Sequence, residues 1–73
     1  MPKLDVKSEE ILRILQRNGR ISNIELAERV ALSPSACLRR VQELERRGVI
    51  KGYRAVVDRE KLGNGFCAYV AVA

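Results

Sequence analysis

Hydrophobic residues recur at helical spacing in three separate stretches of the chain. The first stretch, residues 6–18, carries a broad apolar face made of Ile11, Leu12, Ile14 and Leu15. Asp5 can cap the start of this predicted helix, with Ser8 as a second possible start, and Gly19 follows as a stop signal.

The second stretch has a well-specified beginning. Ser22 and Glu25 stand in the S-x-x-E spacing of a capping box, in which each residue satisfies a free backbone amide of the other. The periodicity predicts a helix that ends near Val30. Its predicted inward-facing residues are Ile24, Leu26, Ala27 and Val30.

The third stretch predicts the most regular helix. Ser33 is a capping residue, and Pro34 occupies the first helical position, where its missing N–H costs nothing. The i, i+3, i+4 spacing predicts a buried stripe of Cys37, Leu38, Val41 and Leu44. Glu43 and Arg47 are spaced for a supporting ion pair, and Gly48 ends the helix.

Residues 49–57, VIKGYRAVV, are rich in β-branched side chains and predict one strand, or two very short ones around Gly52. The polar segment 58–65 predicts a turn or linker, and residues 66–73, FCAYVAVA, predict another strand. Three short helices with a very short link at residues 31–32 are typical of a helix-turn-helix. The expected fold is therefore mainly α, a three-helix winged helix-turn-helix followed by a short β-strand wing or hinge.

The charge of the chain is unevenly distributed. The 73 residues contain 14 lysines and arginines against 9 acids, a net charge of +5. Residues 33–54 hold six of the basic residues against only Glu43 and Glu45. A concentrated basic surplus on a small domain points to a polyanion, with nucleic acid first and an acidic membrane second. A generic soluble surface is the plainer interpretation of the same numbers.

The outward side of the third predicted helix supplies candidate DNA contacts. Arginine can bind guanine through two hydrogen bonds or clamp a phosphate, and free amides at a helix start favour phosphate oxygens. The candidate DNA-binding residues are Ser33, Ser35, Ala36, Arg39, Arg40, Gln42, Arg46, Arg47, Lys51 and Arg54. Arg39, at the centre of the outward face, is the better candidate for reading a base. Arg40 is a candidate phosphate contact or a contact within the domain.

Several functional classes lack the residues they need. The chain has no histidine, and Cys37 and Cys67 lie thirty positions apart, so we expect neither a metal site nor a cofactor. A nucleophile with an activating base is also missing, so we expect no enzyme. Cys37 is expected to be a small core residue. The cysteine usage, the absence of a signal peptide and the lack of a long apolar run predict a cytoplasmic protein without a membrane segment.

Two interpretations of the third helix remain open on the pattern alone. An apolar stripe opposite arginines is found on many amphipathic helices. A winged helix can also serve as a protein-interaction module, because a fold does not decide a function. Such a module usually presents an apolar or acidic outer face, whereas this helix presents Arg39, Gln42 and Arg46.

Residues 18–58, NGRISNIELAERVALSPSACLRRVQELERRGVIKGYRAVVD, resemble the DNA-binding domain of the Lrp/AsnC family. These are leucine-responsive and asparagine-type, or feast/famine, transcription regulators of bacteria and archaea. The resemblance implies a winged helix-turn-helix domain over residues 4–60, with the motif at about 23–42 and its last helix in the major groove. It also places the signature arginine of the family at Arg40.

The resemblance further implies partners. Residues 61–73 would be a linker and the first strand of a truncated ferredoxin-like effector domain. That domain would bind an amino acid and drive self-association into dimers or higher oligomers, which would recognise a near-palindromic double-stranded operator. Ala31 departs from the pattern, because the family usually has glycine there. If this residue has a positive φ, alanine is strained by about 1 kcal/mol.

Overall fold

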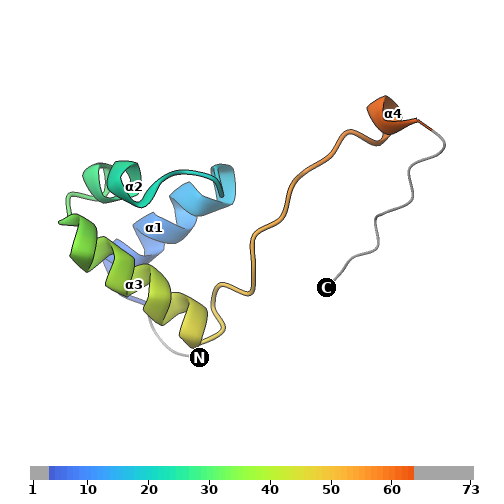
Figure 1. Cartoon of the computed structure of the whole chain (residues 1–73). Helices are drawn as coiled ribbons and strands as arrows, with labels where there is room; N and C mark the ends of the chain where they lie inside the picture. The colour runs from blue at the N-terminus through green and yellow to red at the C-terminus, as the bar shows by residue number, and fades with distance from the viewer. Residues whose placement is uncertain (1–3, 64–73) are drawn as a thin grey trace.

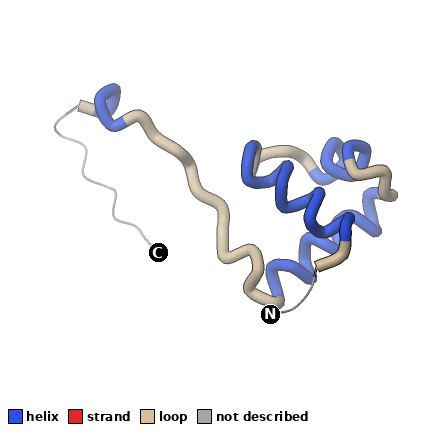
Figure 2. Tube along the Cα trace, turned by 180° about the vertical axis from the view of Figure 1, so that it is seen from behind, coloured by secondary structure: helices blue, strands red, loops and turns tan. Residues whose placement is uncertain are grey.

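The computed structural model describes residues 4–63, and these residues form four helices (Figure 1). Helices α1 (Val6–Arg17), α2 (Asn23–Arg29) and α3 (Pro34–Arg46) make a three-helix body. A loop then leads away to the single turn α4 (Arg59–Leu62), as Figure 2 shows from behind. The prediction of a mainly helical fold is confirmed.

Side chains cap the starts of the three long helices, as predicted. Asp5, Ser22 and Ser33 each accept a hydrogen bond from the backbone N–H three residues further on, at distances of 2.9, 3.1 and 3.2 Å. Pro34 follows as the first residue of α3. Each cap satisfies one of the four amides that a helix start leaves without a partner, which fixes where the helix begins.

The capping box predicted at the start of α2 forms one of its two hydrogen bonds. Ser22 accepts the Glu25 N–H, but the Glu25 carboxylate accepts a hydrogen bond from the Arg29 guanidinium at 3.4 Å instead of returning to Ser22. The i, i+4 ion pair therefore takes the place of the second bond of the box.

Helix α3 ends as predicted at Gly48, which has a φ of 78°. The Val49 N–H donates to the Leu44 carbonyl at 3.0 Å, and the Gly48 N–H donates to the Glu45 carbonyl at 3.1 Å. This pair of bonds is a Schellman motif, which requires a left-handed residue just after the helix. Glycine adopts that conformation without a Cβ clash.

Helix α2 ends in the same motif, but with alanine in the left-handed position. Ala31 has a φ of 58°. The Leu32 N–H donates to the Ala27 carbonyl at 2.9 Å, and the Ala31 N–H donates to the Glu28 carbonyl at 3.2 Å. The condition stated for this position is therefore met: Ala31 has a positive φ, and the tight turn it creates joins α2 to α3.

The core lies where the three long helices meet. Its buried residues are Ile11 of α1, Leu26 and Ala27 of α2, Val30 at the end of α2, and Cys37 and Leu44 of α3. Partly buried side chains surround them, namely Leu4, Leu12, Ile14, Leu15, Ile21, Leu32, Val41 and Ile50. The broad apolar face expected for the first helix is confirmed, as is Cys37 as a core residue.

Two residues predicted to face inward do not. Ile24 is 64% exposed and Leu38 is 44% exposed. Successive helix residues turn by about 100°, which places Ile24 well outside the arc of Leu26 and Val30. Leu38 likewise lies about 100° from Cys37, at the edge of the buried stripe.

The ion pair predicted between Glu43 and Arg47 is also wrong. Glu43 pairs with Arg46 instead, at i, i+3 spacing. Arg47 is the capping residue at the end of α3, where its backbone has already begun to leave the helix. Both spacings bring side chains together on a helix surface, so sequence spacing alone does not choose between them.

The strand predicted for residues 49–57 is not confirmed, because the structure shows no strand within residues 4–63. Residues 51–58 run as exposed loop. A strand needs a partner for its backbone hydrogen bonds, and this loop lies beside none in the described part of the chain. The second predicted strand, 66–73, lies outside the described residues. Asp58 caps α4, where the sequence predicted a turn or linker.

Candidate nucleic-acid interface

Helix α3 has two opposite sides. Its buried side, with Cys37 and Leu44, packs against α1 and α2. The opposite side is exposed and carries Ser35, Arg39, Gln42 and Arg46, which we call the outward stripe. Because the buried side fixes the rotation of the helix, these four side chains face solvent together. The outward stripe predicted from the sequence is therefore present on the surface.

The start of α3 is held in place by the start of α2. The Asn23 Nδ2 donates a hydrogen bond to the Pro34 carbonyl at 2.9 Å. The hydroxyl oxygens of Ser33 and Ser35 lie 3.5 Å apart at the same helix end. Asn23 is not among the candidate residues that the sequence pattern indicates, because helical periodicity gives no sign of a contact between two helices. Its place as the first residue of α2, directly after the capping Ser22, is the signal that the sequence offers.

Arg40 is bound to another part of the domain. Its guanidinium Nη1 lies 2.5 Å from Oδ2 of Asp5, the capping residue of α1. The hydrogen bond from Arg40, followed by that from the Ser8 N–H, lowers the pKa of Asp5 from 3.8 to about 2. The contact ties the start of α1 to the middle of α3, and it places Arg40 about 100° around the helix from Arg39.

A hollow of about 480 Å³ lies between the start of α1 and α3. Four of the predicted DNA-binding residues line it, namely Ala36, Arg39, Arg40 and Arg47, together with Asp5 and Ser8 from the start of α1. The structure thus brings three of the candidate arginines to one surface. Ala36 is half-buried there and leaves room beside the guanidinium groups.

The remaining basic candidates, Lys51 and Arg54, lie on the exposed loop after α3. Tyr53 connects this loop back to the helix, because its hydroxyl donates to the Glu45 carboxylate at 2.7 Å. Partial burial and the adjacent carboxylate raise the pKa of Tyr53 to about 12, so the hydroxyl keeps the proton that it donates. This contact, which the sequence pattern did not reveal, anchors the loop near the end of α3.

Residues 4–63 contain no group of three or more metal-ligating side chains. Cys37 is a buried free thiol whose pKa is raised by that burial, so it has little thiolate to act as a nucleophile. Over the same residues, no helix has both the length and the apolar character required to cross a membrane.

The chain matches the family described as winged helix-turn-helix DNA-binding over residues 4–51. It is 51% identical over 70 residues to the leucine-responsive regulatory protein of Rhizobium meliloti, a match that covers 96% of this chain and 45% of that protein. The chain spans less than half the length of the curated relatives it matches.

Solved structures give the same result. The chain superimposes with a TM-score of 0.81 on a transcriptional regulator from Neisseria meningitidis in complex with L-Met, at 49% identity, covering 86% of this chain and 41% of that one. It superimposes with a TM-score of 0.78 on an AsnC family transcriptional regulator from Agrobacterium tumefaciens, at 39% identity, covering 81% of this chain and 39% of that one.

These matches decide between the interpretations that the sequence left open. The relatives are named as regulators rather than enzymes, which confirms the expectation that the chain is not an enzyme. They also favour the DNA-binding interpretation over the protein-interaction module. The chain belongs to the winged helix-turn-helix DNA-binding domains of the Lrp/AsnC family of transcription regulators.

Proposed function

We propose that the chain binds double-stranded DNA sequence-specifically, with α3 in the major groove, as the DNA-binding module of a prokaryotic transcription regulator. The observation that carries this proposal is the two-sided surface of α3. One side is fixed by the core, and the other presents the outward stripe, a polar and cationic row on a helix that the major groove is wide enough to admit.

Within this docking, Arg39 and Gln42 read base edges. Arg39 is exposed at the centre of the outward stripe and can bind guanine O6 and N7 together, whereas Gln42 suits adenine N6 and N7. The hydroxyls of Ser33 and Ser35, at the start of α3, contact phosphate beside the free amides of that helix end. Ala36 is small enough to let this end approach the bases.

The other basic residues contact the phosphate backbone. Arg46 and Arg47 lie at the end of α3, and Lys51 and Arg54 follow on the loop, all exposed. Arg40 meets a phosphate at the edge of the hollow while its guanidinium is held by Asp5. The contact with Asp5 already orders the Arg40 side chain in the free protein, so less conformational entropy is lost when DNA binds.

The whole regulator adds functions beyond residues 4–60, which we propose as the DNA-binding domain. Residues 49–57 form the wing when they pair with another strand. Residues 61–73 lead as a linker and first strand into a ferredoxin-like effector domain that responds to an amino acid. Two copies then bind the two halves of a near-palindromic operator, in the cytoplasm. The support for this organisation is the likeness to longer regulators, one of them solved with L-Met.

A selection of bound sequences from a random double-stranded DNA pool tests the proposal, followed by affinity measurements on the selected site. Arg39→Ala should weaken binding by about 1–3 kcal/mol and relax the preference at one base pair, while the melting temperature of the protein stays nearly unchanged. In the whole regulator, self-association should select two inverted half-sites about one helical turn apart, as expected for a two-fold symmetric pair.

Arg17→Ala is the matched control, since Arg17 is an exposed arginine on α1, away from the outward stripe. It should reduce affinity far less than Arg39→Ala. Full affinity of the Arg39→Ala, Arg40→Ala double variant would rule out the docking of α3. The absence of any enriched sequence would instead favour a protein-interaction module.

A further inference from the structure

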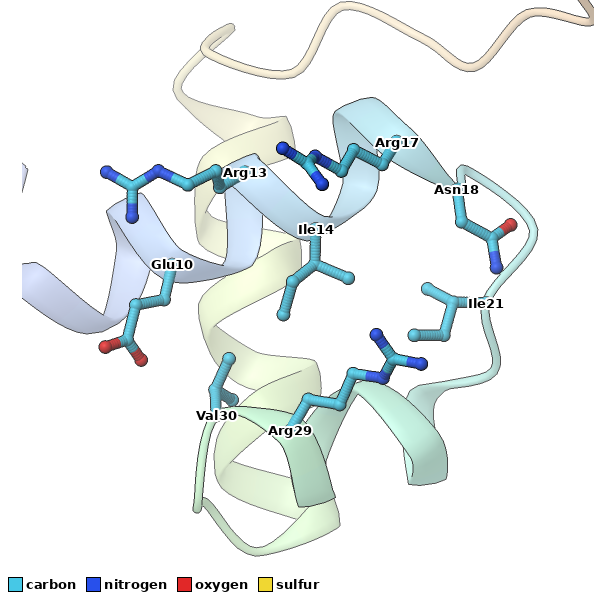
Figure 3. A pocket seen from close by; sticks show the side chains of 8 residues that line it. All are labelled: Glu10, Arg13, Ile14, Arg17, Asn18, Ile21, Arg29 and Val30. Atoms are coloured by element: carbon cyan, nitrogen blue, oxygen red, sulfur yellow. The ribbon is translucent and has the colours of Figure 1, made fainter.

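A second hollow, of about 440 Å³, lies between α1 and α2 (Figure 3). Its apolar floor is made of Ile14, Ile21 and Val30, and its rim carries the guanidinium groups of Arg13, Arg17 and Arg29. We call this surface the α1–α2 hollow. It combines exposed cations with Ile14 and Ile21, which the core leaves partly uncovered, beside the buried Val30.

The rim of the α1–α2 hollow has a surplus of positive charge. Arg13 and Arg17 lie one turn apart on α1, and within residues 4–63 neither forms an ion pair. The Arg29 guanidinium is paired with the Glu25 carboxylate, with Nη2 3.4 Å from Oε2. The one acid in the lining, Glu10, lies 3.9 Å from the Lys7 ammonium, which offsets its charge.

This hollow faces a different side of the domain from the proposed DNA contacts. Its lining comes from α1, from the connection after α1 and from α2, with no residue of α3. Figure 3 shows α3 passing behind these two helices. The outward stripe of α3 points away from α1 and α2, because the opposite side of α3 is the one that packs against them. A ligand in the hollow would therefore leave the outward stripe uncovered.

We propose that the α1–α2 hollow binds an acidic, amphipathic segment of a partner protein while α3 is bound to DNA. Carboxylates of the segment pair with Arg13, Arg17 and Arg29, and an apolar side chain covers the floor formed by Ile14, Ile21 and Val30. Arginine suits this role, since its planar fork binds a carboxylate through two hydrogen bonds and is more weakly hydrated than an ammonium. The inference goes beyond the proposed DNA binding and can fail independently of it.

The chemistry of the hollow favours a peptide over a second stretch of DNA. Phosphate groups have no apolar surface to cover Ile14 and Ile21, so the exposed parts of these two side chains would stay hydrated. An amphipathic helix can cover this apolar floor and pair with the arginines at once, because its apolar residues and its carboxylates can lie on adjoining faces.

A defined probe tests this proposal on the full 73-residue chain. The probe is a capped, fluorescent peptide of about 15 residues built from repeated Leu-Leu-Glu-Glu. Two control peptides replace either the leucines by serine or the glutamates by lysine. We expect saturable binding of the probe, with amide NMR shift changes at Arg13, Arg17, Ile21 and Arg29. The serine peptide should bind more weakly, and the lysine peptide should not bind.

Variants of the protein separate the two surfaces. The Arg13→Ala, Arg17→Ala double variant should bind the probe about five- to tenfold more weakly, the size expected for two partly exposed charge pairs. Its affinity for the selected DNA should be unchanged. Arg39→Ala should do the reverse, and Arg59→Ala on α4 should change neither. Addition of DNA should leave the affinity for the probe unchanged.

Three outcomes would overturn the proposal. The first is that the Leu-Leu-Glu-Glu probe shows no saturable binding up to about 1 mM. The second is that the NMR shift changes map to the outward stripe of α3. The third is that the Arg13→Ala, Arg17→Ala double variant loses as much DNA affinity as Arg39→Ala. The last outcome would place DNA, rather than a peptide, against the α1–α2 hollow.

Discussion

Ala31 is the residue whose local chemistry disagrees most with its place in the fold. It has a φ of 58° in the motif that ends α2, whereas glycine has a φ of 78° at the same position of the motif that ends α3. An L-residue pays about 1–2 kcal/mol in this left-handed region. The hydrogen bonds that Ala31 and Leu32 donate to the end of α2 hold it there nonetheless.

Ala31→Gly is therefore expected to stabilise the domain. Relief of the strain outweighs the extra flexibility of glycine in the unfolded chain, about 0.5–1 kcal/mol, so we expect a net gain of about 0.5–1 kcal/mol. The melting temperature, measured by circular dichroism, should rise by about 3–6 °C.

Gly48→Ala is the matched opposite change. A Cβ at Gly48 would have nothing within 4 Å, so strain of the backbone alone should destabilise the domain by a similar amount. Equal or lower stability of Ala31→Gly would show that the turn between α2 and α3 does not hold a strained alanine.

At the scale of the elements, the sequence predicted the helix boundaries best. Ser22, Ser33, Pro34 and Gly48 act through groups at most a few residues away, so their effect is visible in the local sequence. The same local chemistry placed the outward stripe on α3, because the buried residues Cys37 and Leu44 define the opposite side.

Contacts between distant segments were beyond the sequence pattern. The Arg40–Asp5 ion pair joins residues 35 positions apart, and the hydrogen bond from Asn23 joins two helices. Ile24 was placed on the wrong side because periodicity does not show which arc of a seven-residue helix meets its neighbours. The strand at residues 49–57 was predicted from β-branched composition, but a strand also depends on a partner.

The link between α1 and α3 through Asp5 and Arg40 should make stability depend on pH. The pKa of Asp5 is about 2 in the folded chain, below its ordinary 3.8. The unfolded chain therefore binds more protons as the pH falls, and the stabilisation, present in full above pH about 4, should be lost as the pH approaches about 2. Urea unfolding at several pH values over this window measures the effect.

Arg40→Gln tests the cause of that pH dependence. Without the guanidinium, the free energy of unfolding should fall less steeply between pH about 4 and about 2 than in the unaltered chain. Arg47→Gln removes a nearby charge that has no acidic partner within residues 4–63 and should leave the steep fall in place. Identical pH profiles for all three proteins would show that the Asp5–Arg40 contact does not affect stability.

At the scale of the molecule, two surfaces of residues 4–63 that carry positive charge differ in their chemistry. The outward stripe and the loop after α3 are polar and cationic, which suits a phosphate backbone with base edges between its strands. The α1–α2 hollow places its arginines around an apolar floor. The net charge of +5 is a sum over all charged residues of the chain and does not distinguish the two surfaces.

DNA binding by the whole chain should weaken steeply with salt. Each phosphate that a lysine or arginine neutralises releases counterions, so a plot of log affinity against log salt concentration should fall by about 0.9 per contact. Arg46, Arg47, Lys51 and Arg54 are the proposed phosphate contacts, and alanine at any one of them should reduce the slope by about one. Fluorescence anisotropy on the selected site, repeated over a series of salt concentrations, measures this slope.

Gln42→Ala provides the contrast, because a neutral side chain that reads a base releases no counterion. It should lower affinity and leave the slope unchanged. A slope near zero for the unaltered chain would contradict phosphate contact altogether. An equal reduction of the slope in Gln42→Ala and Arg46→Ala would instead mean that α3 shifts on the DNA when either side chain is removed. The outward stripe would then act as one cooperative surface rather than as separate base and phosphate contacts.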